Sequence, residues 1–496
     1  MRFPYSIAIT PPTVAELSGA GRTWWAWAIG AGLGILGATV ILSLRVEPLP
    51  GSLKPVLEVS SAPAGAAILI DGRPAGHTPA DLALPPGDYQ ISLARDGYVG
   101  VPHAIALRGN QTASVDEELW LRTPQVQRIQ PVFPGASVTD ASFLNDGTLA
   151  LTVALRPGDE QQLWLRDREG TLRRTGPPLT RGPLVVSPDG RRTAYLAQGT
   201  SARTSTFGLG LRLDELWVTG QDDAGGQRLL ALDAGAVSER LVDLRWAPDG
   251  HHLLTMSRLQ QPDGSLRARF LVLDSQATER GLREFLRLPG DVVPASLAWS
   301  PDGRWAAFQV RTGQRTALCV VGVEDGTFRY LADLGADAPS PFPFTPVAWS
   351  PDGRQLLYAA PSQGRSSQGL WPLGAKSPPA LYVASPADSE VGRLLRGAQG
   401  PFPIWRGDGT MLALARPKSS GPLTLRAITP SGQTHDLTTL SLPSGTVAAV
   451  RWDVTHAQAF VAVRRADGLS LSLDPAASQL EYWLVRFRTE GEEAGQ

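Results

Sequence analysis

A repeated six-residue sequence limits what this chain can fold into. Trp-Ser-Pro-Asp-Gly-Arg stands at residues 299–304 and again, unchanged, at residues 349–354. Five degraded copies accompany it, and the aligned positions of the seven copies are Asp146, Asp189, Asp249, Asp302, Asp352, Asp408 and Asp453. The steps between them run from 43 residues (first to second copy) to 60 residues (second to third copy). Self-similarity at this period indicates a propeller or a solenoid.

Each copy predicts a tight corner between two strands. Proline favours the φ angle near −65° that the second residue of a turn adopts, and glycine accepts a positive φ. The aspartate accepts hydrogen bonds from nearby backbone N–H groups. Apolar segments flank the corner, as at residues 296–299, 305–308, 318–321 and 328–331. Four antiparallel strands per ~50 residues predict the blade of a β-propeller, so we assign the repeat's Trp and Asp residues to cores and turns.

On these repeats, the chain resembles the TolB-type, WD-like β-propeller family over residues 125–488. The resemblance implies seven blades. The seventh copy has segments for three strands, at residues 447–452, 459–463 and 482–487. We expect the fourth strand from residues 126–132, ahead of the first copy, because an unclosed ring would expose a strand edge. Residues 489–496 are left as an acidic tail.

The N-terminal part predicts a membrane anchor. A short tail, residues 1–23, precedes residues 24–44, which carry no charge and are long enough to cross a bilayer as a helix. Trp24, Trp25 and Trp27 lie at one end, where interfacial aromatic residues collect. No small-residue cleavage site follows, which favours an uncleaved anchor over a signal peptide. Residues 45–54 form a linker.

Residues 55–122 form a separate module of short strands and glycine-bearing turns. They resemble the PEGA domain through Pro63-Ala64-Gly65-Ala66, Ile70-Asp71-Gly72, Gly76, Thr78-Pro79, Gly87, Tyr89 and Gly97-Tyr98. Ala64 stands where the family has an acidic residue. The resemblance implies a small β-sandwich, commonly extracytoplasmic and tied to envelope proteins, and supplies no ligand.

The sequence offers no catalytic constellation. Its net charge is −1, with 46 basic and 47 acidic residues, which does not favour a nucleic-acid partner. The single cysteine, Cys319, cannot form an intrachain disulfide. Of six histidines only His251 and His252 are adjacent, and neighbours on a strand point to opposite faces. Nucleophile-elbow, nucleotide-binding and zinc-protease motifs are absent. We therefore predict no catalytic residues, no metal, no cofactor and no enzymatic activity.

Insertions between the predicted strands point to one binding face. They fall at residues 198–212, 258–267, 332–345, 360–380 and 462–479, and we expect them to be loops on the face opposite the Pro-Asp-Gly corners. Long loops on a rigid scaffold commonly carry binding residues, and aromatic and Arg side chains anchor interfaces. The predicted partner-binding residues are Arg203, Phe207, Phe342, Phe344, Arg365 and Trp371. The corner face is predicted to be plain.

Together these features predict an all-β protein: a transmembrane helix, a PEGA-like β-sandwich and a seven-bladed β-propeller. The function we expect is a membrane-anchored binding or scaffolding protein of the bacterial cell envelope, engaging a protein or glycan. Its N-terminus would be cytoplasmic and the bulk of the chain extracytoplasmic. One alternative is a propeller enzyme, an envelope glycan or peptide hydrolase or lyase, with its site in the central funnel. Another is a ligand sensor that works with a signalling partner.

Overall fold

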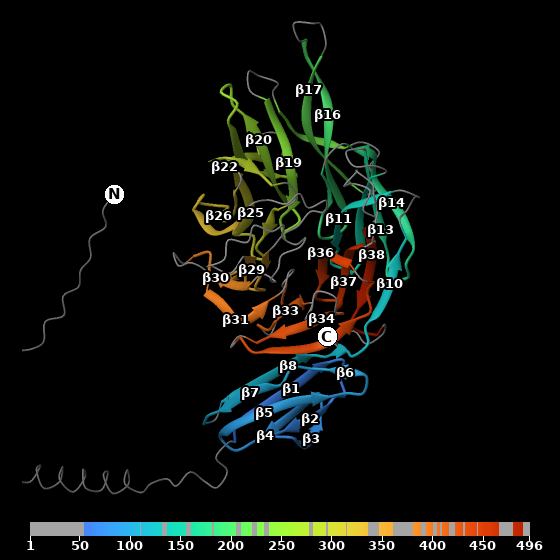
Figure 1. The fold of residues 1–496 in the computed structure, drawn as a ribbon, viewed down its shortest axis with the longest axis vertical. Coiled ribbons are helices and arrows are strands. Elements are labelled where there is room, and N and C mark those ends of the chain that lie inside the picture. The colour runs from blue at the N-terminus through green and yellow to red at the C-terminus, as the bar shows by residue number, and fades with distance from the viewer. Residues whose placement is uncertain are drawn as a thin grey trace, which may run out of the picture.

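The computed structural model describes residues 54–109, 111–130, 136–154, 160–180, 183–204, 210–220, 226–232, 238–276, 281–293, 296–313, 315–335, 347–360, 380–387, 393–399, 404–406, 409–415, 422–429, 432–443, 445–465 and 480–489. The strands β1 to β38 of these residues form ten sheets. The predicted all-β fold is therefore confirmed (Figure 1).

The N-terminal domain consists of two main sheets and one short strand pair. Its strands are β1 (Val56–Ala62), β2 (Ala67–Ile70), β3 (Arg73–His77), β4 (Ala80–Ala83), β5 (Gly87–Ala94), β6 (Tyr98–Val99), β7 (His103–Leu107), β8 (Thr112–Glu118) and β9 (Trp120–Leu121). The sheet orders are β4-β1-β8, β3-β2-β5-β7 and β6-β9. Leu57, Ile68 and Ile91 are fully buried between the main sheets. Asp71 and Gly72, with φ of 49° and 77°, form the tight hairpin that the sequence predicts.

Seven further sheets correspond to the seven repeats, and we call them blades 1 to 7. Blade 1 contains β11 (Ser137–Phe143), β12 (Leu149–Ala154), β13 (Gln161–Arg166) and β14 (Leu172–Thr180). Blade 2 contains β15 (Leu184–Val186), β16 (Arg192–Thr204), β17 (Gly210–Gly220) and β18 (Gln227–Ala231). Blade 3 contains β19 (Ser238–Trp246), β20 (His252–Gln260), β21 (Leu266–Asp274) and β22 (Leu282–Pro289).

The remaining blades follow the same order. Blade 4 contains β23 (Asp291–Val292), β24 (Ala298–Trp299), β25 (Trp305–Thr312), β26 (Arg315–Gly322) and β27 (Phe328–Gly335). Blade 5 contains β28 (Val347–Trp349), β29 (Leu356–Ala360), β30 (Ala380–Ala384) and β31 (Arg393–Gln399). Blade 6 contains β32 (Ile404–Trp405), β33 (Met411–Ala415), β34 (Leu423–Ile428) and β35 (Thr434–Leu440). Blade 7 contains β36 (Gly445–Asp453), β37 (Gln458–Arg465), β38 (Leu480–Arg486) and β10 (Gln125–Ile129).

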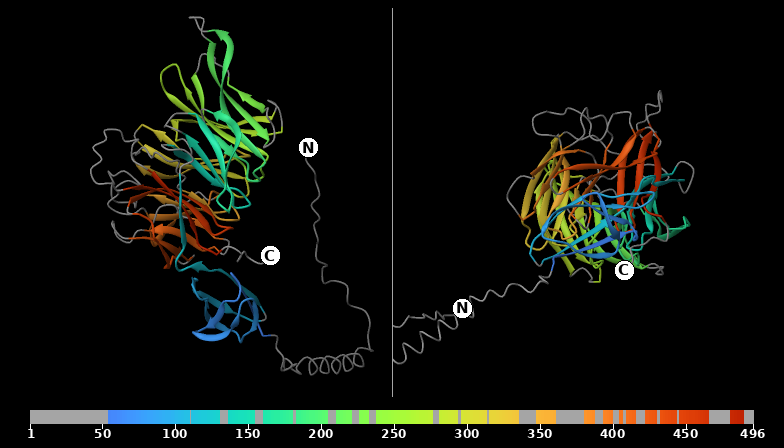
Figure 2. Two further views of the ribbon diagram at one scale, coloured as in Figure 1. Left: turned by 90° about the vertical axis from the view of Figure 1, so that its right-hand side faces the viewer. Right: turned by 90° about the horizontal axis from the view of Figure 1, so that it is seen from below.

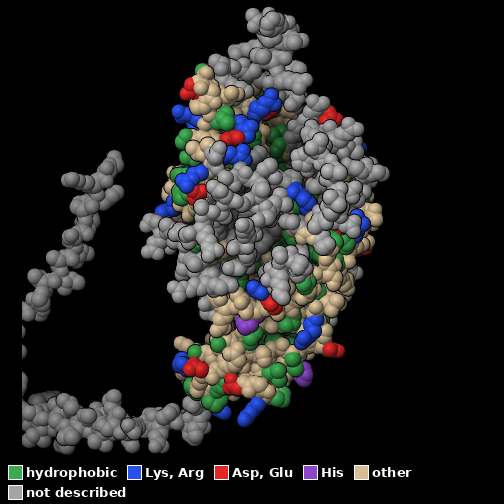
Figure 3. Space-filling model, in the orientation of Figure 1, with side chains coloured by type: hydrophobic (Ala, Val, Ile, Leu, Met, Phe, Trp, Pro, Cys, Tyr) green, Lys and Arg blue, Asp and Glu red, His purple; other side chains and the backbone are tan. Residues whose placement is uncertain are grey.

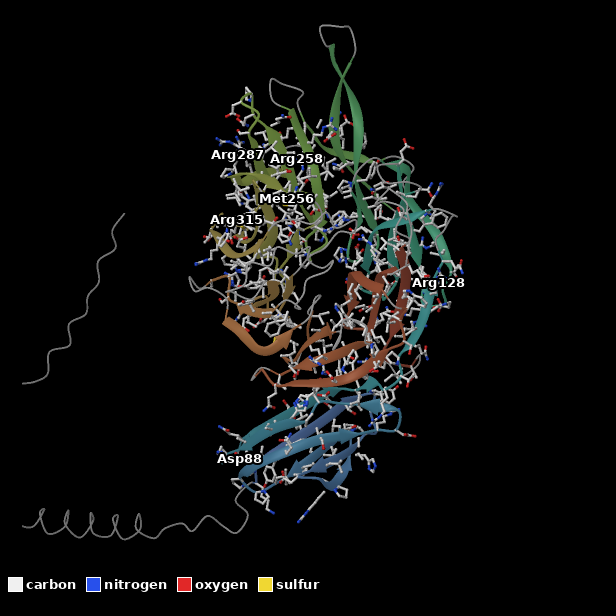
Figure 4. The ribbon with its side chains drawn as sticks, in the orientation of Figure 1. Asp88, Arg128, Met256, Arg258, Arg287 and Arg315 are labelled. Carbon is white, nitrogen blue, oxygen red and sulfur yellow. The ribbon has the colours of Figure 1, made fainter. Side chains whose placement is uncertain are left out.

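Blade 7 joins the two ends of the propeller. Its outer strand, β10, precedes blade 1 in the sequence and pairs antiparallel with β38, from Gln125 opposite Arg486 to Ile129 opposite Tyr482. Arg128 of β10 also forms an ion pair of 3.0 Å with Glu481 (Figure 4). The predicted closure by chain from both ends is therefore confirmed, and the strand edge of β38 is covered.

A hydrophobic cluster lies between every pair of neighbouring blades, including blades 7 and 1. Between blades 3 and 4, for example, the Phe270 and Phe308 rings lie 4.3 Å apart and both are fully buried. The first strands of neighbouring blades contact one another, as β11 does β36 and β15 does β19. The first strands therefore line the centre of the ring, and apolar packing between sheets holds the ring together.

The Pro-Asp-Gly corners form as their residue types require. In blade 4, Asp302 Oδ1 accepts hydrogen bonds from Ser300 Oγ at 2.5 Å and from the Arg304 backbone N–H at 3.1 Å. Gly303 has a φ of +70°, which a side chain would disfavour. Asp189 and Asp352 make the same pair of bonds in blades 2 and 5.

The prediction of loops is wrong for parts of several insertions, because antiparallel strand pairing continues into these segments. Residues 198–212 were expected to form a loop, yet β16 and β17 pair as far as Thr204 opposite Gly210 and project from the ring as a long hairpin (Figure 1). In the same way β20 and β21 extend to Gln260 and Leu266. Continued pairing satisfies backbone N–H and C=O groups that a loop would leave to water.

The N-terminal domain packs against blades 6 and 7 (Figures 1 and 2). Trp120, only 2% exposed, lies edge-on to Phe487 with ring centroids 5.2 Å apart. The Arg406 guanidinium lies 5.8 Å from the Trp120 ring and pairs with Glu117 at 3.6 Å and Glu118 at 3.5 Å. Glu117 and Arg406 are at most 2% exposed, so the junction between the two domains is a buried one.

Among the described residues, no helix is long and apolar enough to cross a membrane. The predicted tail, span and linker up to residue 53, and the acidic tail beyond residue 489, lie outside the described residues.

Candidate functional site

The structure does not bring the six predicted partner-binding residues together as a described surface. Arg203 lies within β16, where nothing is described of its side chain. The other five lie outside the described residues: Phe207, Phe342, Phe344, Arg365 and Trp371. The partner-binding prediction stays a prediction.

The described residues instead place a charged cluster on the central strands. Asp140 comes from β11 of blade 1, Asp243 and Arg245 from β19 of blade 3, and Arg451 from β36 of blade 7. We call these four residues the central cluster. The register shifts in all three strands just ahead of these charges, between Val138 and Asp140 in β11 and at the matching positions of β19 and β36. Such bulges redirect the side chains that follow them.

Asp140 holds the cluster together. Its Oδ2 accepts a hydrogen bond of 2.9 Å from Arg245 Nη1, and its Oδ1 lies 3.4 Å from Arg451 Nη2. Arg245 also lies 3.8 Å from the Asp243 carboxylate. The side chains of Asp140, Arg245 and Arg451 are each about one-fifth exposed, whereas Asp243 is 2% exposed. The Asp140 carboxylate is therefore shared by two guanidinium groups, which come from two other blades.

The environment moves the pKa values of the two carboxyl groups in opposite directions. Burial alone would raise the pKa of Asp140, but the charges of Arg245 and Arg451 outweigh it, so its pKa lies below the ordinary value. Burial raises the pKa of Asp243, against the opposing charge of Arg245 and two backbone N–H bonds. Asp140 is therefore the firmly ionised partner of the two arginines.

A cavity of about 240 Å³ adjoins the cluster. Asp140, Arg245 and Arg451 contribute to its wall, together with the first strand of blade 2 and Trp246. The rest of the lining is mostly apolar, including Phe143 and Leu184. This volume is below the usual range for a drug-sized ligand, so the cavity suits the end of a chain or a small ligand.

Sequence reasoning missed the central cluster, although a signal was present. Arg245 and Arg451 both directly precede the Trp of their repeat, where other copies have Ala298, Ala348 or Ile404. Asp140 and Asp243 likewise stand three residues before the aromatic residue of their copies. Charged residues at a repeat position that is otherwise apolar or small mark the blades that meet at the cluster.

The arginines that gather over blades 3 and 4 in Figure 3 are not an open basic patch. Arg258 binds Asp291, Arg269 binds both Glu239 and Glu284, and Arg287 binds Glu284 (Figure 4). Their charges are therefore compensated by neighbouring strands, and we assign them to the blade surface.

Other reactive residue types are also accounted for structurally. Burial raises the pKa of the Cys319 thiol to about 12, which makes it unreactive. His252 Nδ1 lies 2.6 Å from Asp249 at a corner. Within the parts of the chain that the structure describes, no three His, Cys, Asp or Glu side chains are grouped so as to hold a metal ion.

Comparison with known proteins finds a match to a domain family and a match to a curated protein. Residues 54–122 match the PEGA domain family. The curated relative is the uncharacterized peptidase YuxL of Bacillus subtilis (strain 168), 25% identical over 240 residues, which cover 45% of this chain and 29% of that protein. The chain therefore spans less than a third of the length of that relative.

Similar solved structures include an acylaminoacyl peptidase of Pyrococcus horikoshii, with 14% identity, a TM-score of 0.43 and coverage of 67% of this chain and 50% of that one. The β-propeller domain of the Trilobed protease from Pyrococcus furiosus has 14% identity, a TM-score of 0.40 and coverage of 72% and 94%. TolB from Acinetobacter baumannii has 13% identity, a TM-score of 0.30 and coverage of 67% and 79%.

These comparisons correct one prediction. The absence of catalytic motifs led us to predict that the protein is not an enzyme, and the match to a protein named as a peptidase contradicts that conclusion. A search for short motifs cannot test for a site assembled from distant strands, so the absence of such motifs did not support that prediction. At residues 54–122 the chain thus carries a PEGA domain, and a propeller-like array of β-sheets follows it.

Proposed function

We propose that the protein processes peptides and that the cavity at the central cluster receives the end of the peptide. The observation that carries this proposal is the sharing of Asp140 by Arg245 and Arg451 at the wall of that cavity. The name of the curated relative, a peptidase, supports peptides as the substrate class.

The chemistry of the cluster favours a carboxylate ligand. Guanidinium groups bind carboxylates through paired N–H donors, and the bonds strengthen where water is partly excluded. In the structure Asp140 supplies the compensating charge for the two guanidinium groups, which are each about one-fifth exposed. The carboxylate at the end of a peptide has the same chemistry as the Asp140 side chain, and Arg245 and Arg451 are exposed enough to meet it at the cavity wall.

A pair of peptides that differ only at the C-terminus tests the proposal. We expect a labelled peptide with a free carboxylate to bind the purified full-length chain at least ~10-fold more tightly than its amidated form, because a charge-assisted pair contributes about 1.5–3 kcal/mol. Arg451→Gln should abolish the difference. Arg258→Gln, which removes an arginine paired with Asp291 outside the cavity, should leave it intact.

Mass spectrometry of the same mixtures measures peptide cleavage. Cleavage that depends on Arg451 would identify the chain as a peptidase, and tight binding without cleavage would make it the substrate-binding part of one. Equal affinity for free and amidated peptides would show the proposal to be wrong.

A second candidate is binding in the cell envelope, which the PEGA match favours. In this proposal residues 24–44 anchor the chain in the membrane, the N-terminus is cytoplasmic, and the rest of the chain engages a protein or glycan outside. Protease added to intact spheroplasts should then digest the blades, and full protection of the blades would reverse the proposed orientation.

A further inference from the structure

A groove of about 880 Å³ separates blades 3 and 4 at the end where their Pro-Asp-Gly corners lie. Blade 3 contributes the corner at Asp249, the end of β21 and the start of β22. Blade 4 contributes Trp299, the corner at Asp302 and the turn at Glu324. This is the face that the sequence predicted to be plain. The corners themselves are tight, but two adjacent corners and the turns beside them enclose a space.

The floor of the groove is apolar. Val272 and Val323 are 7% and 6% exposed and belong to the cluster between the two blades. Trp299 is half-buried, packs against the same cluster and completes the floor. The volume lies within the range of ordinary ligand pockets, so the groove has room for several residues of an extended chain.

The rim of the groove is acidic. Four carboxylates line it, from Asp249, Asp274, Asp302 and Glu324, against two guanidinium groups, from Arg283 and Arg304. Arg283 already crosses the groove and donates to the Val323 carbonyl at 2.7 Å and the Glu324 carbonyl at 3.0 Å.

Asp249 is satisfied by His252 and by two backbone N–H groups, and Asp302 by its own corner. Asp274, in blade 3, accepts one backbone hydrogen bond, from the Gln276 N–H at 2.9 Å, and Glu324 lines the groove from the turn of blade 4.

We propose that this groove binds a peptide segment in which basic residues alternate with apolar ones. The excess of carboxylates on the rim attracts lysine and arginine side chains, and the floor formed by Val272, Trp299 and Val323 accepts the apolar side chains between them. The site is separate from the central cluster, with which it shares no lining residue.

The test uses a hexapeptide of alternating Leu and Lys. Its N-terminus is acetylated, a fluorescent label is attached near that end, and its C-terminus is amidated. Its amidated end has no carboxylate for the central cavity, so this test and the test of the proposed function fail independently. Fluorescence anisotropy with the purified full-length chain should show saturable binding. A Leu-Glu peptide and a Ser-Lys peptide should each bind at least ~10-fold more weakly, since one reverses the charge and the other removes the apolar side chains.

Two variants locate the binding. Asp274→Asn with Glu324→Gln should weaken binding of the Leu-Lys peptide at least ~10-fold, while keeping hydrogen-bond acceptors in place. Asp352→Asn is the matched control, because Asp352 accepts a backbone N–H two residues on, at 3.0 Å, in a corner outside the groove. It should change the affinity less than ~2-fold. The proposal would be overturned if the double variant kept the wild-type affinity or if the Leu-Glu peptide bound as tightly as the Leu-Lys peptide. It would also be overturned if calcium chloride displaced the Leu-Lys peptide more than sodium chloride does at equal ionic strength.

Discussion

At the scale of the residue, the central cluster shows how half-buried charges are tolerated between apolar sheets. Arg245 and Arg451 lie on the first strands of blades 3 and 7, and each is compensated by Asp140. Such an arrangement is not strong evidence of net stabilisation, because burying charges costs free energy. Removing Asp140 would destabilise the cluster, because Arg451 and Arg245 would each lose the carboxylate that they share.

Asp140→Asn should lower the free energy of unfolding by about 1.5–3 kcal/mol at pH 7, because it removes a charge-assisted hydrogen bond from a partly exposed pair. Because the pKa of Asp140 is lowered in the folded state, its stabilisation is complete above the unfolded value of about 4 and is lost as the pH falls through the folded value. Urea unfolding from pH 7 down to pH 3 should therefore show the difference from wild type shrinking below about pH 4.

Asp243→Asn is the control, because burial raises the pKa of Asp243 and the amide oxygen still accepts one of the two bonds from the Leu244 and Leu297 N–H groups. It should cost less than Asp140→Asn at pH 7. A larger loss for Asp243→Asn would contradict the assignment of Asp140 as the ionised partner of both arginines.

At the scale of the element, strand β10 decides whether the sheets form a closed ring. It is short, and its sequence alternates poorly, with Ile129 5% exposed and Gln125 and Arg128 turned to solvent. Its place is determined by pairing with β38, whose edge would otherwise be open. The sequence allowed this pairing to be predicted because copy seven has segments for only three strands.

A disulfide tests the register of this closure. Gln125 and Arg486 are opposite partners in the β10–β38 pair, and opposite residues of antiparallel strands are close enough for a disulfide. Gln125→Cys with Arg486→Cys should form a bond on mild oxidation and stabilise the fold by on the order of 4 kcal/mol, since it closes a very long loop. Cys319 is buried and will not compete.

Gln127→Cys with Arg486→Cys, two residues out of register, is the matched control and should form much less of the bond. Non-reducing gels and thermal unfolding measure both results. Equal cross-linking of the two pairs would refute the observed register.

At the scale of the whole molecule, the PEGA domain and the blades share one interior. Val101 and Trp120 belong to the same hydrophobic cluster as the inner residues of blades 6 and 7. The Leu121 N–H donates to the Phe487 carbonyl at 2.9 Å, and Thr438 Oγ1 donates to the Arg122 carbonyl at 2.7 Å. Apolar packing, backbone bonds and the Arg406 ion pairs thus join the two domains, so we expect them to unfold together.

Trp120→Ala should lower the free energy of unfolding by about 3–5 kcal/mol, because it opens a cavity against Phe487 and Arg406. Calorimetry should show the single transition of the wild type separating into two, one for each domain. Trp164→Ala, in blade 1 and away from the junction, should destabilise the protein without dividing the transition. Two transitions in the wild type would show that the junction does not couple the domains.

The sequence by itself determined the elements that depend on local chemistry. The Pro-Asp-Gly corners, the Asp71-Gly72 hairpin and the PEGA motifs were predictable because each turn demands particular φ angles and short-range hydrogen bonds. The number of repeats and the closing strand followed from the same periodicity.

Only the tertiary structure decided which distant residues meet. Asp140 and Arg451 are 311 positions apart, and their contact depends on the ring closing and on bulges that redirect both strands. The groove between blades 3 and 4 likewise exists only because two unremarkable corners are packed side by side. The β16–β17 hairpin, whose outer part the sequence predicted to be a loop, also depends on tertiary structure. Its length is determined by backbone pairing, and backbone hydrogen bonds do not require particular residue types that the sequence would reveal.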